Sequence, residues 1–304
     1  LDLLNIFVAR NDESLNQNGH YLAMNSAASS LNTLATTSFH ISGLQMIHRA
    51  KELISKIQLD GDVSYIINIL QNIHSKVSSK PYKIFTACSK DALKNKLEEF
   101  ETSQAKQEQQ LIDATQSQIA WITGSQVCYC AQAFAGVARE HPDSAALSVL
   151  ATVLRNGFLH TAIREKGGAY GAGASNDTAT NTFKLFSYRD PKCKETFQAF
   201  EDAISWAKTS INEQHLEEAI LGVVSSIDKP LSPVGEAKND FNFNLEDINI
   251  DERLAFRQRI INCSIEDLVR VNKKYLTKES KRSILAGESF KDQAQELKLE
   301  ILEV

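Results

Sequence analysis

The hydrophobic positions of this chain recur with helical spacing along much of its length. Apolar residues appear every three to four positions through residues 44–57, and the same spacing continues through residues 66–77. These patterns predict two amphipathic helices, the first of which ends at the Asp60-Gly61-Asp62 turn. Lys80-Pro81 then breaks the helical pattern, so we place a domain boundary near Ser79.

Beyond this boundary, short apolar runs alternate with longer helical patterns. Residues 82–88 and 121–134 predict strands, and the Ala/Leu-rich segment 142–165 predicts a helix that ends at Gly167-Gly168. Two apolar runs that flank the turn-forming sequence NDTATN predict a hairpin. The remaining predictions are helices at 93–100, 197–207 and 216–227, a long loop at 228–244, a capping box that opens a helix at Ser264, and a last strand at 283–286.

Composition and charge narrow the possible partners. The chain has 304 residues, 42% of them hydrophobic, which is enough for one large or two modest domains. A net charge of -5 argues against a nucleic-acid partner and favours cationic peptides. The longest apolar runs fall short of the roughly 18 residues that a membrane helix needs, so no membrane partner is expected. Because the chain begins at Leu1, we expect an upstream segment.

The five cysteines give no sign of a bridge or metal framework. They are odd in number, scattered and without C-x-x-C spacing, which argues against disulfides and a structural zinc site and favours a reducing compartment. On a strand, Cys128 and Cys130 would share one face and pack as small hydrophobic side chains.

The candidate site is the sequence REKGGAYG, which is followed by a second cluster, SYRDP, at residues 187–191. Arg164 and Tyr170 carry donors that can polarise a carbonyl group or hold an oxyanion. Gly167, Gly168 and Gly171 allow a close backbone approach or a positive φ. Local sequence alone favours a simpler interpretation: a helix end with an Arg near the dipole, a glycine stop and a Tyr that faces the core.

Other chemical motifs fail on specific grounds. GGAYGAG follows a helix, whereas a phosphate loop follows a strand, and no serine stands in a G-x-S-x-G elbow. The segment from His215 to Glu218 matches the first four positions of H-x-x-E-H, but Ala219 replaces the second histidine. This segment therefore predicts the solvated face of an amphipathic helix, and we predict no metal in this chain.

A long, ordered stretch resembles the C-terminal half of presequence proteases, which are zinc peptidases of the pitrilysin and insulinase superfamily. The resemblance rests on RNGFLHTAIREKGGAYGAGASND, FKLFSYRDP, LEEAILGVVSSIDKPLSPVGEA and FRQRIINCSIEDLVRV, and it extends upstream to NGHYLAMNSAAS. It implies an α+β fold, a mostly antiparallel sheet backed by helices. Residues 1–79 would be the helical end of a third peptidase-homology domain and residues 80–304 the fourth.

The resemblance also implies a division of labour. The family holds its zinc in its first domain, so this chain would bind no metal and be inactive alone, with the N-terminal half of the same enzyme as its partner. Arg164 and Tyr170 match the Arg and Tyr that reach across a closed chamber. There they would hydrogen-bond a carbonyl of an unfolded peptide and steady the oxyanion beside zinc-bound hydroxide, and Gly167, Gly168 and Gly171 would let the peptide backbone approach.

Two questions stay open at the level of sequence. The chain could instead belong to a non-catalytic structural or peptide-binding subunit of the same superfamily, because the decisive zinc motif lies outside it. The expected compartment is the cytoplasm for a bacterial source and an organelle matrix for a eukaryotic one.

Overall fold

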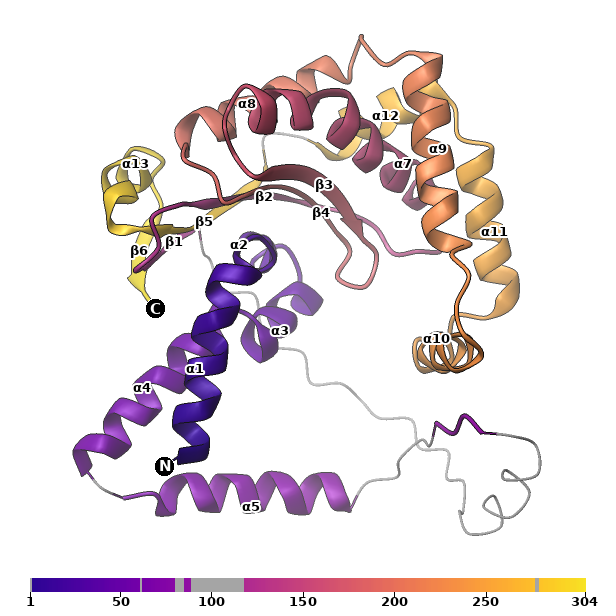
Figure 1. Ribbon diagram of the computed structural model, residues 1–304. Helices are drawn as coiled ribbons and strands as arrows, with labels where there is room; N and C mark the ends of the chain where they lie inside the picture. Colours follow the sequence, from indigo (N-terminus) through magenta and orange to yellow (C-terminus); the bar gives the residue numbers. More distant parts are fainter. Residues whose placement is uncertain (1, 61, 80–84, 89–117, 277–278) are drawn as a thin grey trace.

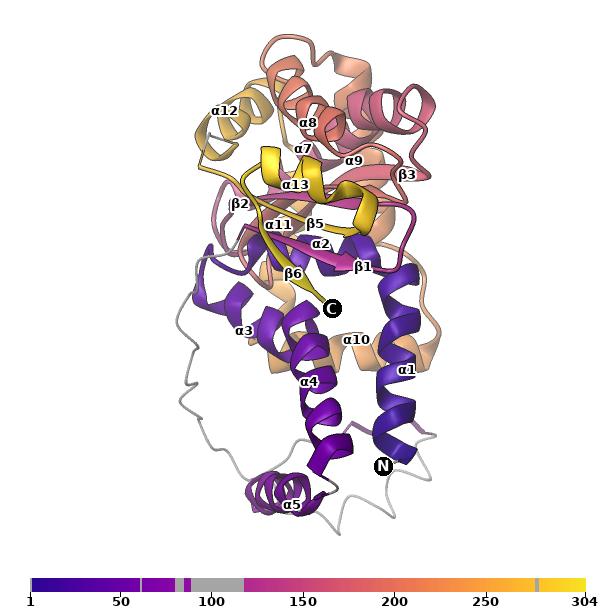
Figure 2. The same ribbon diagram turned by 90° about the vertical axis from the view of Figure 1, so that its left-hand side faces the viewer.

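A single six-stranded sheet lies at the centre of the molecule, with helices on both of its faces (Figure 1). The structure is a computed structural model that describes residues 2–60, 62–79, 85–88, 118–276 and 279–304. One group of helices, drawn in orange and magenta, covers the upper face in Figure 1, and the indigo N-terminal helices lie against the lower face. Figure 2 shows α1 (Asp2–Gln17) and α4 (Leu44–Asp60) running away from the sheet toward α5 (Ser64–Ser78).

The remaining helices follow the chain in two groups. Two short helices, α2 (Gly19–Ala28) and α3 (Thr33–Ser42), complete the lower layer. The upper layer and the C-terminal end contain α7 (Ser144–Leu154), the π-helix η2 (Arg155–Glu165), α8 (Lys194–Trp206), α9 (Glu213–Ile227), α10 (Pro233–Leu245), α11 (Ile250–Ile261), α12 (Ile265–Tyr275), the 3-10 turn η3 (Glu288–Phe290) and α13 (Lys291–Glu296).

The strand order of the sheet is β3-β4-β2-β5-β1-β6. Three of the five neighbouring pairs are antiparallel, and the two pairs that involve β1 are parallel. The sequence therefore predicted the fold class correctly as α+β with a mostly antiparallel sheet. The strands are β1 (Ile119–Thr123), β2 (Tyr129–Ala135), β3 (Gly171–Asp177), β4 (Thr182–Tyr188), β5 (Lys281–Gly287) and β6 (Glu300–Glu303).

Both faces of the sheet are buried, and alternate residues of β2 separate the two cores. Cys130 and Phe134 face the core under α7 and α8, whereas Tyr129 and Ala133 face the core formed with α2 and α3. Gly19 of α2 lies directly on Tyr129, since a Cβ at this glycine would stand 2.6 Å from the tyrosine ring. The N-terminal helices thus share a hydrophobic core with the sheet, and the assignment of residues 1–79 to a preceding domain stays a prediction.

The structure corrects three element predictions. The run 121–134 forms two strands rather than one, because residues 124–128 turn between β1 and β2. The long loop predicted at 228–244 is mostly helix α10, which starts where the Ser232 hydroxyl accepts a hydrogen bond from the Gly235 amide and Pro233 occupies the first turn. The strand at 283–286 is not the last one, since β6 follows it.

Other element predictions are confirmed or fall outside the described residues. The hairpin is β3 and β4, and Ser264 and Asp267 form the predicted capping box of α12. Residues 82–84 of one predicted strand and all of the predicted helix at 93–100 lie outside the described residues, and residues 85–88 have no regular structure.

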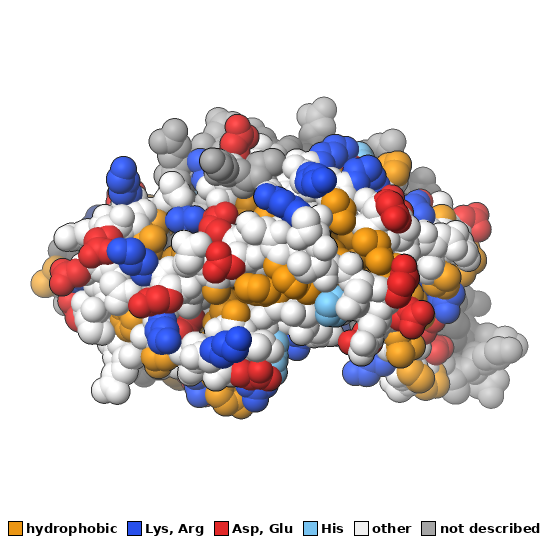
Figure 3. All heavy atoms as spheres, turned by 90° about the horizontal axis from the view of Figure 1, so that it is seen from above, with side chains coloured by type: hydrophobic (Ala, Val, Ile, Leu, Met, Phe, Trp, Pro, Cys, Tyr) orange, Lys and Arg blue, Asp and Glu red, His pale blue; other side chains and the backbone are white. Residues whose placement is uncertain are grey.

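The helical segment from Ser144 to Glu165 is the only one in the described part of the chain that is long and apolar enough to cross a membrane. It has 22 residues, of which a window of 18 has a mean hydropathy of 1.2, and half of that window is buried. Its first part, α7, packs against β3, α9 and α12, which is the environment of a core helix. Figure 3 shows the outer surface of the upper layer, where positive and negative side chains are interspersed.

Candidate functional site

Arg164 is presented at the end of a wide helix. The α-helix α7 continues without a break into η2, and the amide of Lys166 donates to the carbonyl of Thr161, five residues back, at 3.0 Å. Leu159 and Ile163 are buried on the inner side of this helix, which packs against β3. The helix therefore fixes the backbone of Arg164 while its side chain faces solvent.

A glycine turn joins this helix to the hairpin. The amide of Gly168 donates to the Arg164 carbonyl, and the amide of Ala169 donates to the Ile163 carbonyl, both at 3.1 Å. Gly168 has a φ of +87°, which L side chains rarely adopt, and a Cβ at Gly167 would stand 2.3 Å from the Ile163 carbonyl oxygen. These two glycines are therefore required by the turn itself. Gly171 is not, because its nearest neighbour would be in ordinary contact at 3.8 Å.

Tyr170 stands at the start of β3 with its side chain in solvent. Tyr170 is 68% exposed, although the neighbouring residue, Ala169, is buried. The Tyr170 amide donates to the carbonyl of Arg189 at 3.3 Å, and its ring meets that of Tyr188 edge-on, with 5.5 Å between the centroids. The local interpretation of a core-facing tyrosine is therefore wrong. The second sequence cluster, at residues 187–191, lies directly beside the first and supports the tyrosine.

His160 organises the charge around Arg164. Arg164 Nη1 donates to Nε2 of His160 at 3.1 Å, and Nδ1 of His160 lies 3.4 Å from a carboxylate oxygen of Glu165. Since a guanidinium group has only donors, His160 accepts from Arg164 on Nε2 and presents N–H on Nδ1 to Glu165. The sequence analysis missed His160, although its spacing of four residues from Arg164 on one helix was a usable signal.

The site therefore contains a guanidinium whose one side-chain partner is His160 and a phenol without a side-chain partner, among the residues that the structure describes. Within the described ranges, no carboxylate pairs with Arg164, and no side chain forms a hydrogen bond with the Tyr170 hydroxyl. Such a set can donate hydrogen bonds to a carbonyl oxygen or an oxyanion. It offers no nucleophile of its own.

The histidines of this chain do not fit a catalytic zinc site. His215 caps α9: its amide donates to the Asn212 side chain at 2.9 Å, and its Nδ1 accepts from the Asn212 amide at 3.3 Å. It packs its ring against Trp206. In the described part of the chain, the one group of three or more side chains suited to a metal contains no histidine.

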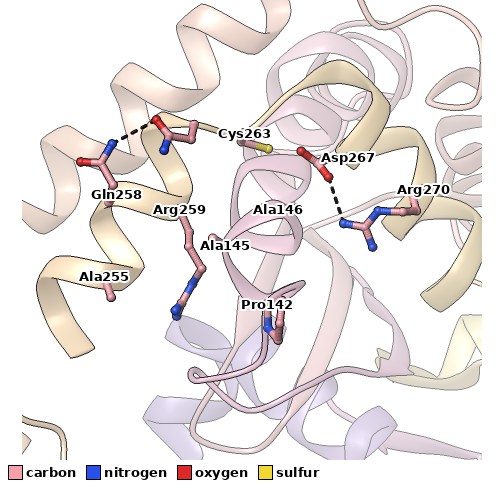
Figure 4. A pocket seen from close by; sticks show the side chains of 10 residues that line it. Pro142, Ala145, Ala146, Ala255, Gln258, Arg259, Cys263, Asp267 and Arg270 are labelled. Atoms are coloured by element: carbon pink, nitrogen blue, oxygen red, sulfur yellow. Dashed lines mark hydrogen bonds and ion pairs between the residues drawn. The ribbon is translucent and has the colours of Figure 1, made fainter. Parts of the chain in front are cut away.

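A pocket of about 410 Å³ lies away from this site, between the start of α7 and helices α11 and α12 (Figure 4). Its charged groups already have partners. Asp267 pairs with Arg270, and Arg259 donates both to Glu252 and to the carbonyl of Arg139. We assign no function to this pocket.

The fold has a counterpart among solved peptidase structures. A protease from Helicobacter pylori superimposes with a TM-score of 0.53 over 66% of this chain and 53% of that protein, at 17% sequence identity. At this level of identity the likeness concerns the fold alone. It shows that this chain and part of that protease share a fold.

Sequence comparison defines the family more narrowly. The family model described as the PreP C-terminal domain matches residues 123–285, so the chain belongs to this family. It is 30% identical over 284 residues to the mitochondrial presequence protease of Yarrowia lipolytica, an alignment that covers 90% of this chain and 28% of the relative. It is also 41% identical over 136 residues to the mouse mitochondrial presequence protease, covering 44% of this chain and 13% of the relative.

The comparisons confirm the resemblance to presequence proteases that the sequence motifs indicated. The chain spans less than a third of the length of these two relatives. Arg164, Gly167, Gly168, Tyr170 and Gly171 all fall within the matched segment.

Proposed function

We propose that this chain is the substrate-gripping C-terminal portion of a zinc-dependent endopeptidase that degrades unfolded peptides in a closed chamber. Membership of the PreP C-terminal domain family supports the peptidase class, and the names of the relatives support a presequence-protease-like activity. The observation that carries the proposal is the exposure of Arg164 and Tyr170, two donors without a protein acceptor other than His160, on a rigid helix-to-hairpin junction.

Arg164 and Tyr170 act on the carbonyl group of the peptide bond that is cut. Both donate hydrogen bonds to this oxygen, and these bonds strengthen as negative charge develops on it during attack by water. The buried side of η2 and the pairing of β3 with β4 hold the two backbones in place, so little reorganisation is needed. The turn at Gly167 and Gly168, together with Gly171, carries few side-chain atoms and leaves room for an extended peptide backbone.

The catalytic zinc belongs to another part of the enzyme. The histidines described above do not form a catalytic ligand set, so the chain contributes binding and orientation, and alone it is inactive. The N-terminal half of the same enzyme is the partner that completes the chamber. An exposed apolar face on helix α5 supports the proposal that a partner packs against this chain. Leu70, Ile73 and Val77 on this face are 57%, 52% and 68% exposed.

The relatives' names also bear on the compartment. Because they are mitochondrial proteins, we place this protein in an organelle matrix if its source is eukaryotic. A bacterial source would place it in the cytoplasm.

The test is the kinetics of the complete enzyme with Arg164→Ala or Tyr170→Phe. We expect kcat to fall at least tenfold, because the loss of one oxyanion donor costs about 2.7–4 kcal/mol of transition-state stabilisation. Zinc content should stay unchanged. Tyr21→Phe is the matched control, because this tyrosine is 49% exposed on α2 and lies outside the site. Activity equal to wild type in both site variants would sink the assigned roles.

The alternative, a non-catalytic subunit, is decided by the upstream sequence. An intact H-x-x-E-H motif and cleavage of a quenched peptide by the complete protein support the peptidase. A degraded motif, combined with peptide binding that Arg164→Ala weakens, would support a binding subunit.

A further inference from the structure

A compact cluster of three buried cysteines lies in the core between the sheet and helices α7 and α8. Cys128 precedes β2, Cys130 belongs to it, and Cys193 is the N-terminal cap of α8, more than sixty residues later. All three are fully buried free thiols. Their sulfur atoms lie within 4.8 Å of one another, and the Sγ atoms of Cys128 and Cys130 are 3.6 Å apart.

This spacing suits a metal ion. Zinc binds thiolate sulfur at about 2.3 Å, so two sulfurs of a tetrahedral zinc site stand about 3.8 Å apart. An oxygen borders the same space: the carbonyl of Lys192 accepts from the Cys128 thiol at 3.1 Å and from the Cys130 thiol at 3.9 Å. A bound metal would replace the protons that now link these sulfurs to one another and to this oxygen.

The start of α8 favours negative charge on one of the three sulfurs. Cys193 stands at the N-terminus of a helix of 13 residues, where the helix dipole stabilises a thiolate. Three thiolates and Zn²⁺ leave one net negative charge, whereas Cu⁺ would leave two, and each further buried charge costs free energy. The charge balance therefore favours zinc.

We propose that Cys128, Cys130 and Cys193 form a structural zinc site that fastens the start of β2 to the start of α8. This proposal is independent of the proposed peptidase function and of any catalytic zinc. The sequence analysis argued against a structural zinc site because the five cysteines are odd in number, scattered and without C-x-x-C spacing. The fold supplies the third cysteine.

Such a site would also support the candidate functional site. Cys128 and Asp190 exchange two backbone hydrogen bonds, at 2.9 and 2.8 Å, and the preceding residue, Arg189, accepts from the amide of Tyr170. A metal bound at Cys128 would thus stiffen the segment that holds Tyr170.

The first test is the zinc content of the complete protein, purified under reducing conditions and measured by elemental analysis. Wild type should contain one more zinc atom per chain than Cys193→Ser. Cys263→Ser is the matched control, since this cysteine is also buried but lies outside the cluster, and it should keep the wild-type content. Equal zinc in wild type and Cys193→Ser would overturn the proposal, and copper in place of zinc would overturn the choice of metal.

A second measurement needs no variant. A mercurial reagent added to the wild-type protein displaces zinc from thiolates but not from histidine and carboxylate ligands, and a chromogenic chelator detects its release. Release of one zinc atom per chain is expected. No release, or a disulfide between any two of the three cysteines in the protein as purified, would contradict a zinc site even if Cys193→Ser fails to fold.

Discussion

Two of the clusters that combine an arginine with a tyrosine have opposite surroundings. At the start of α7, Arg270, Lys274 and Tyr275 all donate hydrogen bonds to the buried carboxylate of Asp143. At the end of η2, Arg164 and Tyr170 have no carboxylate partner in the described part of the chain. In the first cluster the donors all bind an acceptor within the protein, whereas in the second cluster some donors have no acceptor within the described residues.

The two clusters differ in whether their donors find an acceptor within the protein. Donors that converge on a buried acceptor stabilise the fold. If that acceptor were removed, each donor would lose its hydrogen bond and the folded state would become less stable. Donors that are held in place by the backbone, with only a histidine beside them, can bind an external acceptor at little structural cost. The residue types alone do not separate the two cases.

The largest expected effect on stability is at Asp143. Asp143→Asn removes the charge that three donors share, and we expect the free energy of unfolding to fall by about 2–3 kcal/mol, the size of a charge-assisted hydrogen bond. Asp240→Asn is the matched control, because Asp240 is 60% exposed in its pair with Arg253 and should change stability by less than about 1 kcal/mol. Urea denaturation measures the free energy of unfolding of both variants. Equal losses of stability in the two variants would contradict a special role for the buried Asp143.

The pH dependence of stability also tests the role of the Asp143 carboxylate. Burial by itself would raise the pKa of Asp143, but hydrogen bonds from Lys274, Tyr275 and Arg270 outweigh it and hold the pKa well below its ordinary value. The stabilisation is therefore fully present above the unfolded-state pKa of about 3.9 and is lost as the pH falls further. The difference in urea midpoint between wild type and Asp143→Asn should be constant at neutral pH and shrink below about pH 4. A difference independent of pH down to the acid range would contradict this account.

A smaller effect is expected at the glycine turn. Gly168→Ala forces a side chain into a positive φ and should cost about 1–2 kcal/mol of stability. Gly171→Ala is the control within the same sequence motif, since its Cβ would meet only Tyr188 in ordinary contact, and it should be close to neutral. Thermal unfolding of the two variants checks the contrast. Equal destabilisation would show that the turn is not what selects glycine at residue 168.

Local signals predicted much of the fold but not all of it. The helices at 44–60 and 64–78 and the hairpin β3–β4 follow from spacing and turn residues that lie close together in sequence. Helix α10 was predicted as a loop because none of its residues is buried, so no apolar stripe marked it, and Pro230 and Pro233 suggested irregular structure. The cap at Ser232 and Pro233 was the signal that could have found it.

The candidate site was predicted as a sequence cluster but not as a surface. The spacing of Arg164 and Tyr170 showed that both lie at a helix-to-hairpin junction. Whether Tyr170 faces the core or solvent depends on the pairing of β3 with β4 and on the hydrogen bond to Arg189, which spacing does not reveal. Cys193 joins Cys128 for the same reason: contacts between distant segments arise only in the folded sheet.

The smallest expected effect concerns His160, which touches Arg164 and would act on a substrate only through it. His160→Leu removes the acceptor that orients the guanidinium, and we expect kcat/KM of the complete enzyme to fall two- to fivefold, or about 0.5–1 kcal/mol, the usual net value of one hydrogen bond. His160→Gln should restore most of this loss, because its amide oxygen can accept from Arg164. In an Arg164→Ala background, His160→Leu should have no further effect, since there is no guanidinium left to orient. If His160→Leu lowered activity equally with and without Arg164, the histidine would act on the fold rather than on the arginine, and the second cluster would depend on its surroundings as much as the first.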